Sequence, residues 1–210
     1  TENDESNIGI LIDGQTAYAS VYDQLANNYD VSLFPIPENV SAESVGLVKG
    51  RVIVEDGNDK GCDIKLYAKK AKTSVTYSSN VYDGEFVLSL VEKERYLMKI
   101  EKEGYEFCAS FIDVNDTVKN LNFSISQLIG GESYYLPNIV FDESNSLTDE
   151  SLEILNEFIL YLKSSRFRIE IFAPGNQAET IAEYIIKSGV RKDRIAVSKQ
   201  SSEKVGYRLQ

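Results

Sequence analysis

The sequence contains no histidine and no tryptophan, and it has only one methionine, two cysteines and four prolines among its 210 residues. Histidine is the commonest general base and a common metal ligand in proteins. Its absence excludes zinc sites built on histidine and nucleophiles activated by it. No apolar run approaches the roughly 20 residues that a helix needs to cross a bilayer. We therefore expect no transmembrane segment in this chain.

The two cysteines, Cys62 and Cys108, are separated by one segment that is rich in predicted strands. In an oxidising compartment they could form a disulfide, whereas elsewhere they would serve as two small buried hydrophobic residues. Sequence alone does not fix the distance between their Cα atoms. Both alternatives stay open.

Positive charge is also scarce, because 22 basic residues stand against 33 acidic ones, which gives a net charge of −11 and an isoelectric point near 4.6. Nucleic acid phosphates would be repelled by such a protein unless it carried a local basic patch. The densest basic cluster, residues 69–72, is predicted to be the solvated end of a strand. We therefore expect no nucleic-acid partner.

The C-terminal part of the chain carries the clearest structural pattern. Residues 138–141 form an apolar run after Pro137, which predicts a buried strand. Thr148 is the expected N-cap of a helix whose apolar residues recur at spacings of three and four, at Leu152, Leu155, Phe158, Ile159 and Leu162. One face of this helix is expected to lie in a core and the opposite face in water.

The pattern continues to the end of the sequence. A second strand is predicted at residues 167–172, followed by a helix that ends at Gly189, and short strands are predicted at residues 194–198 and 205–209. The order βαβαββ predicts a two-layer domain with both helices on one face of a sheet.

The N-terminal two thirds are predicted to be all β. The Asp13-Gly14 pair joins expected strands at residues 8–12 and 16–21, and residues 29–35 add another extended segment. From residue 46 to 126, short alternating strands and turn residues recur as in a β-sandwich. Paired glycines at 130 and 131 predict a linker that few contacts cross. The expected units are residues 1–44, 45–129 and 132–210, an α+β multidomain protein.

Two resemblances concern the β-rich part. The pattern of Gly50 to Val52, Asp83 to Phe86 and Tyr96 to Tyr105 resembles the carboxypeptidase regulatory-like domain, which implies a β-sandwich for spacing and surface contact and no peptidase activity. The N-terminal segment resembles the closing repeat of a β-propeller in multidomain envelope proteins of Bacteroidetes. Its matching residues are Asp13, Gly14, Thr16, Tyr18, Asp30, Val31, Pro35 and Pro37.

The C-terminal unit resembles the OmpA-family C-terminal domain, whose members bind peptidoglycan. The residues that carry this resemblance are Leu136, Asn138, Ile139, Phe141, Asp142, Leu147, Ser151, Ile169, Glu170, Ile171, Ala178, Ile181, Tyr184, Ile185, Gly189, Val190, Arg194 and Ile195. The resemblance implies a periplasmic, outer-membrane-associated protein whose partners are envelope proteins or peptidoglycan.

The family's ligand site looks degenerate in this chain. In the family, an Asp after the second strand and an Arg on the second helix grip the charged amino-acid end of diaminopimelate, and here these positions fall on Asn176 and Gln177. Charge-assisted contacts to both ends of that ligand are therefore lost. The remaining ligand-binding candidates are Asp142 and Lys204, the latter as a substitute cation or as an edge-strand charge that discourages pairing.

These features predict a non-catalytic scaffold or interaction protein of the cell envelope, with the alternative that the chain still anchors to peptidoglycan through an altered site. The acidic pairs 142–143 and 149–150 are explained by loop solvation and helix capping, so we predict no catalytic residues. No cofactor is expected. A calcium site from Asp56, Asn58 and Asp63 is weighed and disfavoured, because the spacing lacks the run of ligands in an EF-hand, and no metal site is predicted.

Overall fold

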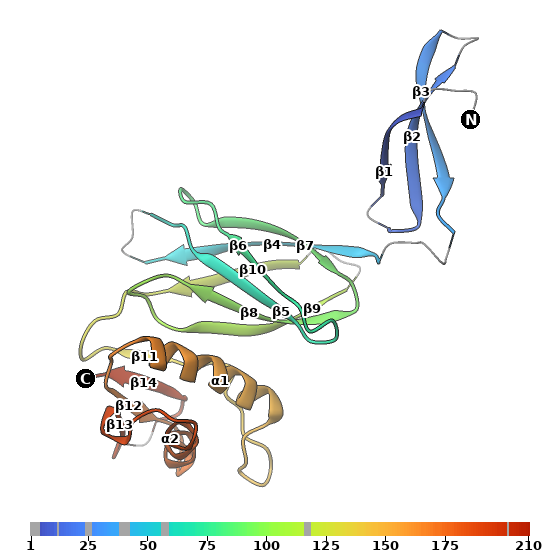
Figure 1. Ribbon diagram of the computed structural model, residues 1–210. Coiled ribbons are helices and arrows are strands. Elements are labelled where there is room, and N and C mark those ends of the chain that lie inside the picture. Colours follow the sequence, from blue (N-terminus) through green and yellow to red (C-terminus); the bar gives the residue numbers. More distant parts are fainter. Residues whose placement is uncertain are drawn as a thin grey trace.

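A computed structural model describes residues 5–11, 13–23, 27–37, 43–55, 59–115, 119–200 and 202–210. This part of the chain is mostly β, with several sheets and two α-helices. It is arranged in three units along the sequence (Figure 1). No helix within the described ranges has the length and apolar character needed to span a membrane.

The N-terminal unit is a three-stranded antiparallel sheet. Its strands are β1 (Glu5–Ile10), β2 (Thr16–Asp23) and β3 (Asn28–Pro35), in the order β1-β2-β3. The predicted turn lies between β1 and β2, where Gly14 has a φ of 67° and the Asp13 carboxylate accepts the backbone N–H groups of Gln15 and Thr16. The sheet stands apart from the rest of the chain (Figure 1), although the Ser44 hydroxyl donates to the Asp13 carbonyl at 2.9 Å.

The middle unit contains two sheets that share one core. The first has the order β10-β4-β7, with strands β4 (Val45–Val54), β7 (Glu85–Val91) and β10 (Lys119–Ile125), and β10 runs parallel to β4. The second is antiparallel in the order β6-β5-β8-β9, with strands β5 (Asp63–Ala68), β6 (Ser74–Ser78), β8 (Glu94–Glu101) and β9 (Cys108–Val114).

Alternate residues of both sheets point into this core, as the alternation in the sequence predicts. Among them are Val52 and Leu88 of the first sheet and Leu66 and Met98 of the second. Gly50 fits the close contact between strands, because a Cβ there would lie 2.3 Å from the Phe86 ring. The neighbouring strands therefore require a glycine at this position.

The C-terminal unit has the predicted order βαβαββ. Its elements are β11 (Ser133–Tyr135), α1 (Asp149–Ser164), β12 (Ile169–Phe172), α2 (Gln177–Lys187), a 3₁₀ turn η1 (Lys192–Arg194), β13 (Ile195–Val197) and β14 (Gly206–Leu209). The sheet order is β11-β14-β12-β13. Thr148 caps α1 as predicted, by accepting the Ser151 N–H at 3.3 Å, and Gly189 follows α2 with a φ of 96°.

The predicted strand at residues 138–141 is wrong, and the strand that opens the unit is β11 instead. The segment makes only an isolated bridge between Phe141 and Leu147. Its backbone is held by a side chain: the Ser151 hydroxyl accepts the Val140 N–H at 2.7 Å and lies 2.9 Å from the Val140 carbonyl. These backbone groups therefore bond to α1 rather than to a neighbouring strand.

The expectation of a linker that few contacts cross is also wrong. Helix α1 lies between the C-terminal sheet and the outer face of β8 and β9 (Figure 1). Leu97, Phe107 and Ala109 of the middle unit belong to the same buried cluster as the core residues of α1, α2 and the C-terminal sheet. The face of α1 that was expected in water therefore packs on another unit.

Candidate functional site

The loop before α1 engages the carboxylate of the predicted site residue Asp142. Its Oδ1 accepts the N–H groups of Ser144 and Ser146, both at 2.9 Å, and the Ser144 hydroxyl at 2.7 Å. These hydrogen bonds, the Ser144 hydroxyl first, hold the pKa of Asp142 below its usual value. The carboxylate thus shapes its own loop.

The same loop reaches the start of α2 through Asn145. The Asn145 amide nitrogen donates to Asn176 Oδ1 at 2.9 Å, and the Gln177 amide nitrogen donates to Asn145 Oδ1 at 3.2 Å. Asn145 adopts a φ of 60°, in the left-handed region that asparagine tolerates better than most residues. The three neutral amides form one network on the surface.

This network changes the expected role of Asn176. Asparagine is a favoured N-cap residue, and Asn176 occupies the N-cap position of α2, but its side chain makes no capping hydrogen bond. Its oxygen accepts from Asn145 instead. Asn145 was missed as a site residue, and an Asn in a turn-forming DESNS segment was the signal that could have drawn attention to it.

Lys204 does not join this group of side chains in the structure. Its ammonium lies 4.8 Å from the centroid of the Tyr135 ring, a cation–π contact, and Tyr135 in turn meets Phe172 edge-on at 6.1 Å. The structure therefore connects Asp142, Asn176 and Gln177 through one loop, and it places Lys204 against β11. The amide network contains neither a cation nor a free carboxylate.

The other polar feature is a row of ion pairs between α1 and the middle unit. Glu150, Glu153 and Glu157 occupy one face of the helix because they are three and four residues apart. Glu150 pairs with Arg95 at 2.5 Å, Glu153 with Lys69, and Glu157 with Lys99 at 2.6 Å. We call these three pairs the α1 charge row. They join α1 to β8 and to Lys69, the residue that follows β5.

Lys99 is the most buried cation of the α1 charge row, with 16% of its side chain exposed. Burial acts to lower its pKa, but hydrogen bonds to Glu157 and Glu101 outweigh that effect, and the pKa is raised. The lysine therefore stays charged at neutral pH within the interface.

Aromatic rings fill the space beside the α1 charge row. Phe107 meets the rings of Phe158 at 5.2 Å and Tyr161 at 5.8 Å. The Tyr161 hydroxyl donates to the Tyr105 carbonyl at 3.0 Å, and the Phe107 N–H donates to the Tyr207 hydroxyl at 3.3 Å. The interface thus combines apolar packing with hydrogen-bonded tyrosine hydroxyl groups.

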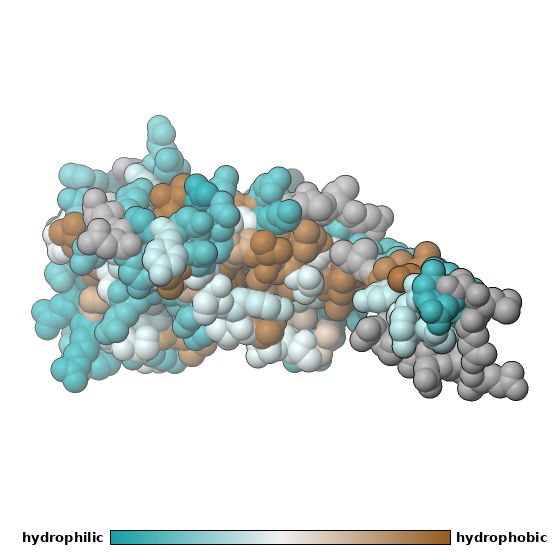
Figure 2. Space-filling view, turned by 90° about the horizontal axis from the view of Figure 1, so that it is seen from above, coloured by the Kyte–Doolittle hydropathy of each residue, from teal (hydrophilic) through white to brown (hydrophobic). Residues whose placement is uncertain are grey.

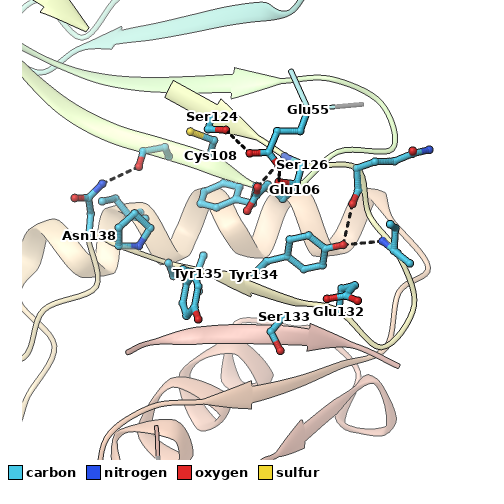
Figure 3. Close-up of a pocket in the computed structure, with 17 residues that line it drawn as sticks. Glu55, Glu106, Cys108, Ser124, Ser126, Glu132, Ser133, Tyr134, Tyr135 and Asn138 are labelled. Carbon is cyan, nitrogen blue, oxygen red and sulfur yellow. Dashed lines mark hydrogen bonds between the residues drawn. The ribbon is translucent and has the colours of Figure 1, made fainter. Parts of the chain in front are cut away.

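A cavity of about 540 Å³ lies along this interface, between β9 and β10 on one side and the segment from Glu132 to Asn138 on the other (Figure 3). The Glu55 carboxylate accepts the hydroxyls of Ser124 at 3.0 Å and Ser126 at 2.8 Å. Glu106 accepts the Ser126 N–H at 2.8 Å. The residues that line the cavity include three glutamates and no lysine or arginine.

Burial shifts two titratable side chains at this cavity, Glu106 and Cys108, toward their neutral forms. Burial raises the pKa of the Glu106 carboxyl. Burial is also the main cause that raises the pKa of the Cys108 thiol, to about 12, and the nearby Glu106 and Cys62 add to it. A thiol with such a pKa is protonated at neutral pH and is a poor nucleophile. Cys62 is likewise a free buried thiol, so the disulfide alternative is not realised in this structure.

A second cavity, of about 920 Å³, is bordered by β5, β8 and the end of α1, and it shares Glu106 and Phe107 with the first. Neither cavity is lined by Asn176 or Gln177. Across the described ranges, no three Cys, Asp or Glu side chains gather as a metal site would require. Of the disfavoured calcium ligands, Asp56 and Asn58 lie outside the described residues.

Comparison with known proteins gives little. No family model and no curated protein matches the chain. Among solved structures, the crystal structure of S.CueP aligns over 60% of this chain and 80% of its own, with 10% identity and a TM-score of 0.31. A leucine-rich repeat protein from Bacteroides thetaiotaomicron VPI-5482 aligns over 68% of this chain and 25% of its own, with 9% identity and a TM-score of 0.26. At these TM-scores neither likeness bears on fold or function.

Proposed function

We propose that this chain is a non-catalytic scaffold or interaction protein of the cell envelope, with a C-terminal OmpA-like domain whose diaminopimelate site has lost its charges. The middle unit is proposed to be a carboxypeptidase regulatory-like sandwich, and the N-terminal sheet a propeller-type repeat. The proposed location is the periplasm, in association with the outer membrane.

One observation carries this proposal: Asn145 bonds both residues that the resemblance aligns with the family's ligand-binding charges. Asn176 and Gln177 are neutral, and each uses its side chain within the protein at 2.9 and 3.2 Å. Each missing charge-assisted contact would be worth about 1.5–3 kcal/mol. Two of them together correspond to a loss of affinity of roughly a hundredfold or more.

The fixed contact between the middle and C-terminal units also supports the proposal of a scaffold. The α1 charge row and the Phe107 ring bury a face of α1 that an independent ligand-binding domain would leave in water. An apolar interface of this kind limits relative motion of the two units, as a spacer requires.

Co-sedimentation with purified peptidoglycan tests the proposal. We expect the wild type to stay in the supernatant and the double variant Asn176→Asp, Gln177→Arg to be retained, because it restores both charges. Free diaminopimelate should release the retained variant. Lys187→Gln, a charge change at the exposed end of the same helix, is the matched control and should behave as the wild type.

The alternative function is an anchor that still binds peptidoglycan through altered residues. It predicts that the wild type itself is retained and that diaminopimelate competes it off. That result would overturn the proposal of a degenerate site.

A further inference from the structure

The N-terminal sheet has almost no core of its own. Among its described side chains, the buried hydrophobic ones are Ala17 and Ala19, each 4% exposed. A three-stranded sheet is stable only if it has a hydrophobic face or packs against another element. The small volume of two alanines supplies little of that, so contact with a further segment would stabilise the sheet.

One face of this sheet presents larger apolar side chains to solvent. Tyr29, Val31 and Leu33 alternate along β3, and their side chains are 58%, 70% and 64% exposed. The register places them beside Tyr22, Ser20 and Tyr18 of β2, so this face carries no charged residue along these two strands. We call Tyr29, Val31 and Leu33 the β3 apolar face. Figure 2 shows hydrophobic residues at the surface of this unit, at the right of the view.

The backbone of β3 is also open along its outer edge. Within the described residues β3 pairs with β2 alone. The Ile36 N–H donates to the Gln15 carbonyl at 2.7 Å, so residues at even positions direct their N–H groups toward β2. Because these directions alternate in an antiparallel ladder, Tyr29, Val31 and Leu33 direct theirs outward. An edge with open donors and acceptors is a template for another strand.

The charge of this part of the chain selects the occupant. The first 48 residues contain eight acidic residues and no basic one, and the first basic residue is Lys49. A second copy of the chain would bring acidic surface against acidic surface. Asp30, between Tyr29 and Val31, places a carboxylate on the opposite face of the strand. A partner with positive charge is therefore favoured.

We propose that the outer edge of β3 is a docking site for an extended segment of another protein in which apolar and basic residues alternate. The segment joins the sheet as a fourth strand, in the manner of strand addition. Its apolar side chains lie beside those of the β3 apolar face, as cross-strand neighbours, and its basic side chains lie on the side of Asp30. This surface lies outside the C-terminal site, so the proposal stands independently of peptidoglycan binding.

Hydrogen exchange of the full chain, measured by mass spectrometry, tests the proposal with a synthetic peptide of about nine alternating valine and lysine residues, the length of a long strand. We expect the peptide to slow exchange at residues 29–33. The same peptide with alternate backbone nitrogens methylated keeps its side chains and charge but loses the donors of one edge. It should give no protection, and neither should an alternating valine and glutamate peptide.

Val31→Pro provides the matched test in the protein. Proline removes an outward N–H without breaking the ladder with β2, and it leaves the charge unchanged. We expect it to weaken binding of the valine and lysine peptide about fivefold or more, the effect of one lost hydrogen bond. Thr76→Pro in the edge strand β6 is the control and should leave peptide binding unchanged. The Ser79 N–H donates to the Cys62 carbonyl, toward β5, so odd-numbered residues of β6 direct their N–H groups inward and Thr76 directs its N–H outward.

Equal protection by the methylated peptide would overturn the proposal, because binding would then follow charge alone. So would peptide binding that Val31→Pro leaves unchanged, or no protection at any peptide concentration. A concentration-dependent dimer in sedimentation that Val31→Pro abolishes would assign the edge to a second copy instead. If Val31→Pro unfolds the sheet, the comparison of the two peptides still decides the matter.

Discussion

Phe107→Ala should separate the unfolding of the middle and C-terminal units. Phe107 belongs by sequence to the middle unit, but its ring is 6% exposed and lies 5.2 Å from Phe158 and 5.8 Å from Tyr161 of α1. Replacing a buried Phe by Ala costs about 3–5 kcal/mol. Here that loss falls on the contact between two units rather than inside one of them.

The ion pairs of the α1 charge row are too weak to hold the two units together once the Phe107 ring is removed. Side-chain exposures in the α1 charge row run from 16% at Lys99 to 52% at Glu150. Pairs of this kind contribute about 0–1 kcal/mol each when exposed. The apolar contact therefore dominates the coupling between the units.

Phe86→Ala is the matched control, because Phe86 is 5% exposed and belongs to the core of the middle unit. Both variants should be destabilised by a similar amount. Hydrogen exchange along a urea series should show β5 and α2 losing protection together in the wild type and in Phe86→Ala. In Phe107→Ala, α2 should lose protection at lower urea than β5.

Joint loss of protection in Phe107→Ala, with the same midpoint for β5 and α2, would refute this reasoning. It would mean that the contact around Phe107 contributes nothing to the coupling. A cost below about 1 kcal/mol would refute it as well, because a buried phenyl ring cannot be removed so cheaply from a packed core.

Three further outcomes are expected. Ser151→Ala should lower the free energy of unfolding in urea by about 1–3 kcal/mol, because it removes the hydroxyl that holds the Val140 backbone. Ser164→Ala, on the exposed side of α1, is the control and should change it by no more than about 0.5 kcal/mol. Equal losses in the two variants would contradict this account. Burial raises the pKa of Glu106, so the folded state binds its proton more tightly than the unfolded state, and stability falls as pH rises through the raised value. The stability gained by Glu106→Gln should therefore grow with pH, and a gain that is constant with pH would count against it. Cys108, whose pKa burial raises to about 12, should react slowly with iodoacetamide at neutral pH in the folded protein and fast in urea; rapid labelling without urea would be inconsistent with the structure.

The local signals in the sequence predicted elements well. Thr148 caps α1, Gly189 ends α2, and Asp13 with Gly14 forms the first turn, because each depends on groups within a few residues. The alternation in the middle unit likewise follows from the two faces of each strand. These features needed no knowledge of distant residues.

The failures have a common cause in contacts between residues 11 or more positions apart, which local sequence patterns do not report. Residues 138–141 have the composition of a strand, but Ser151 takes up the backbone of Val140. Glu150, Glu153 and Glu157 have the pattern of a solvated helix face, but their cations precede them by more than 50 residues. The amide network was missed for the same reason, because Asn145 and Asn176 meet only in the folded chain.

Because α1 lies between two sheets, substitutions in the middle and C-terminal units are expected to depend on one another during evolution. Phe107 and Phe158 fill one shared volume, so a larger side chain on one side must be met by a smaller one on the other. We expect substitutions at Leu97, Phe107 and Ala109 to accompany substitutions on α1 among relatives of this protein. Grafting the C-terminal unit onto another protein would expose that helix face, unless the new neighbour brought an equivalent surface.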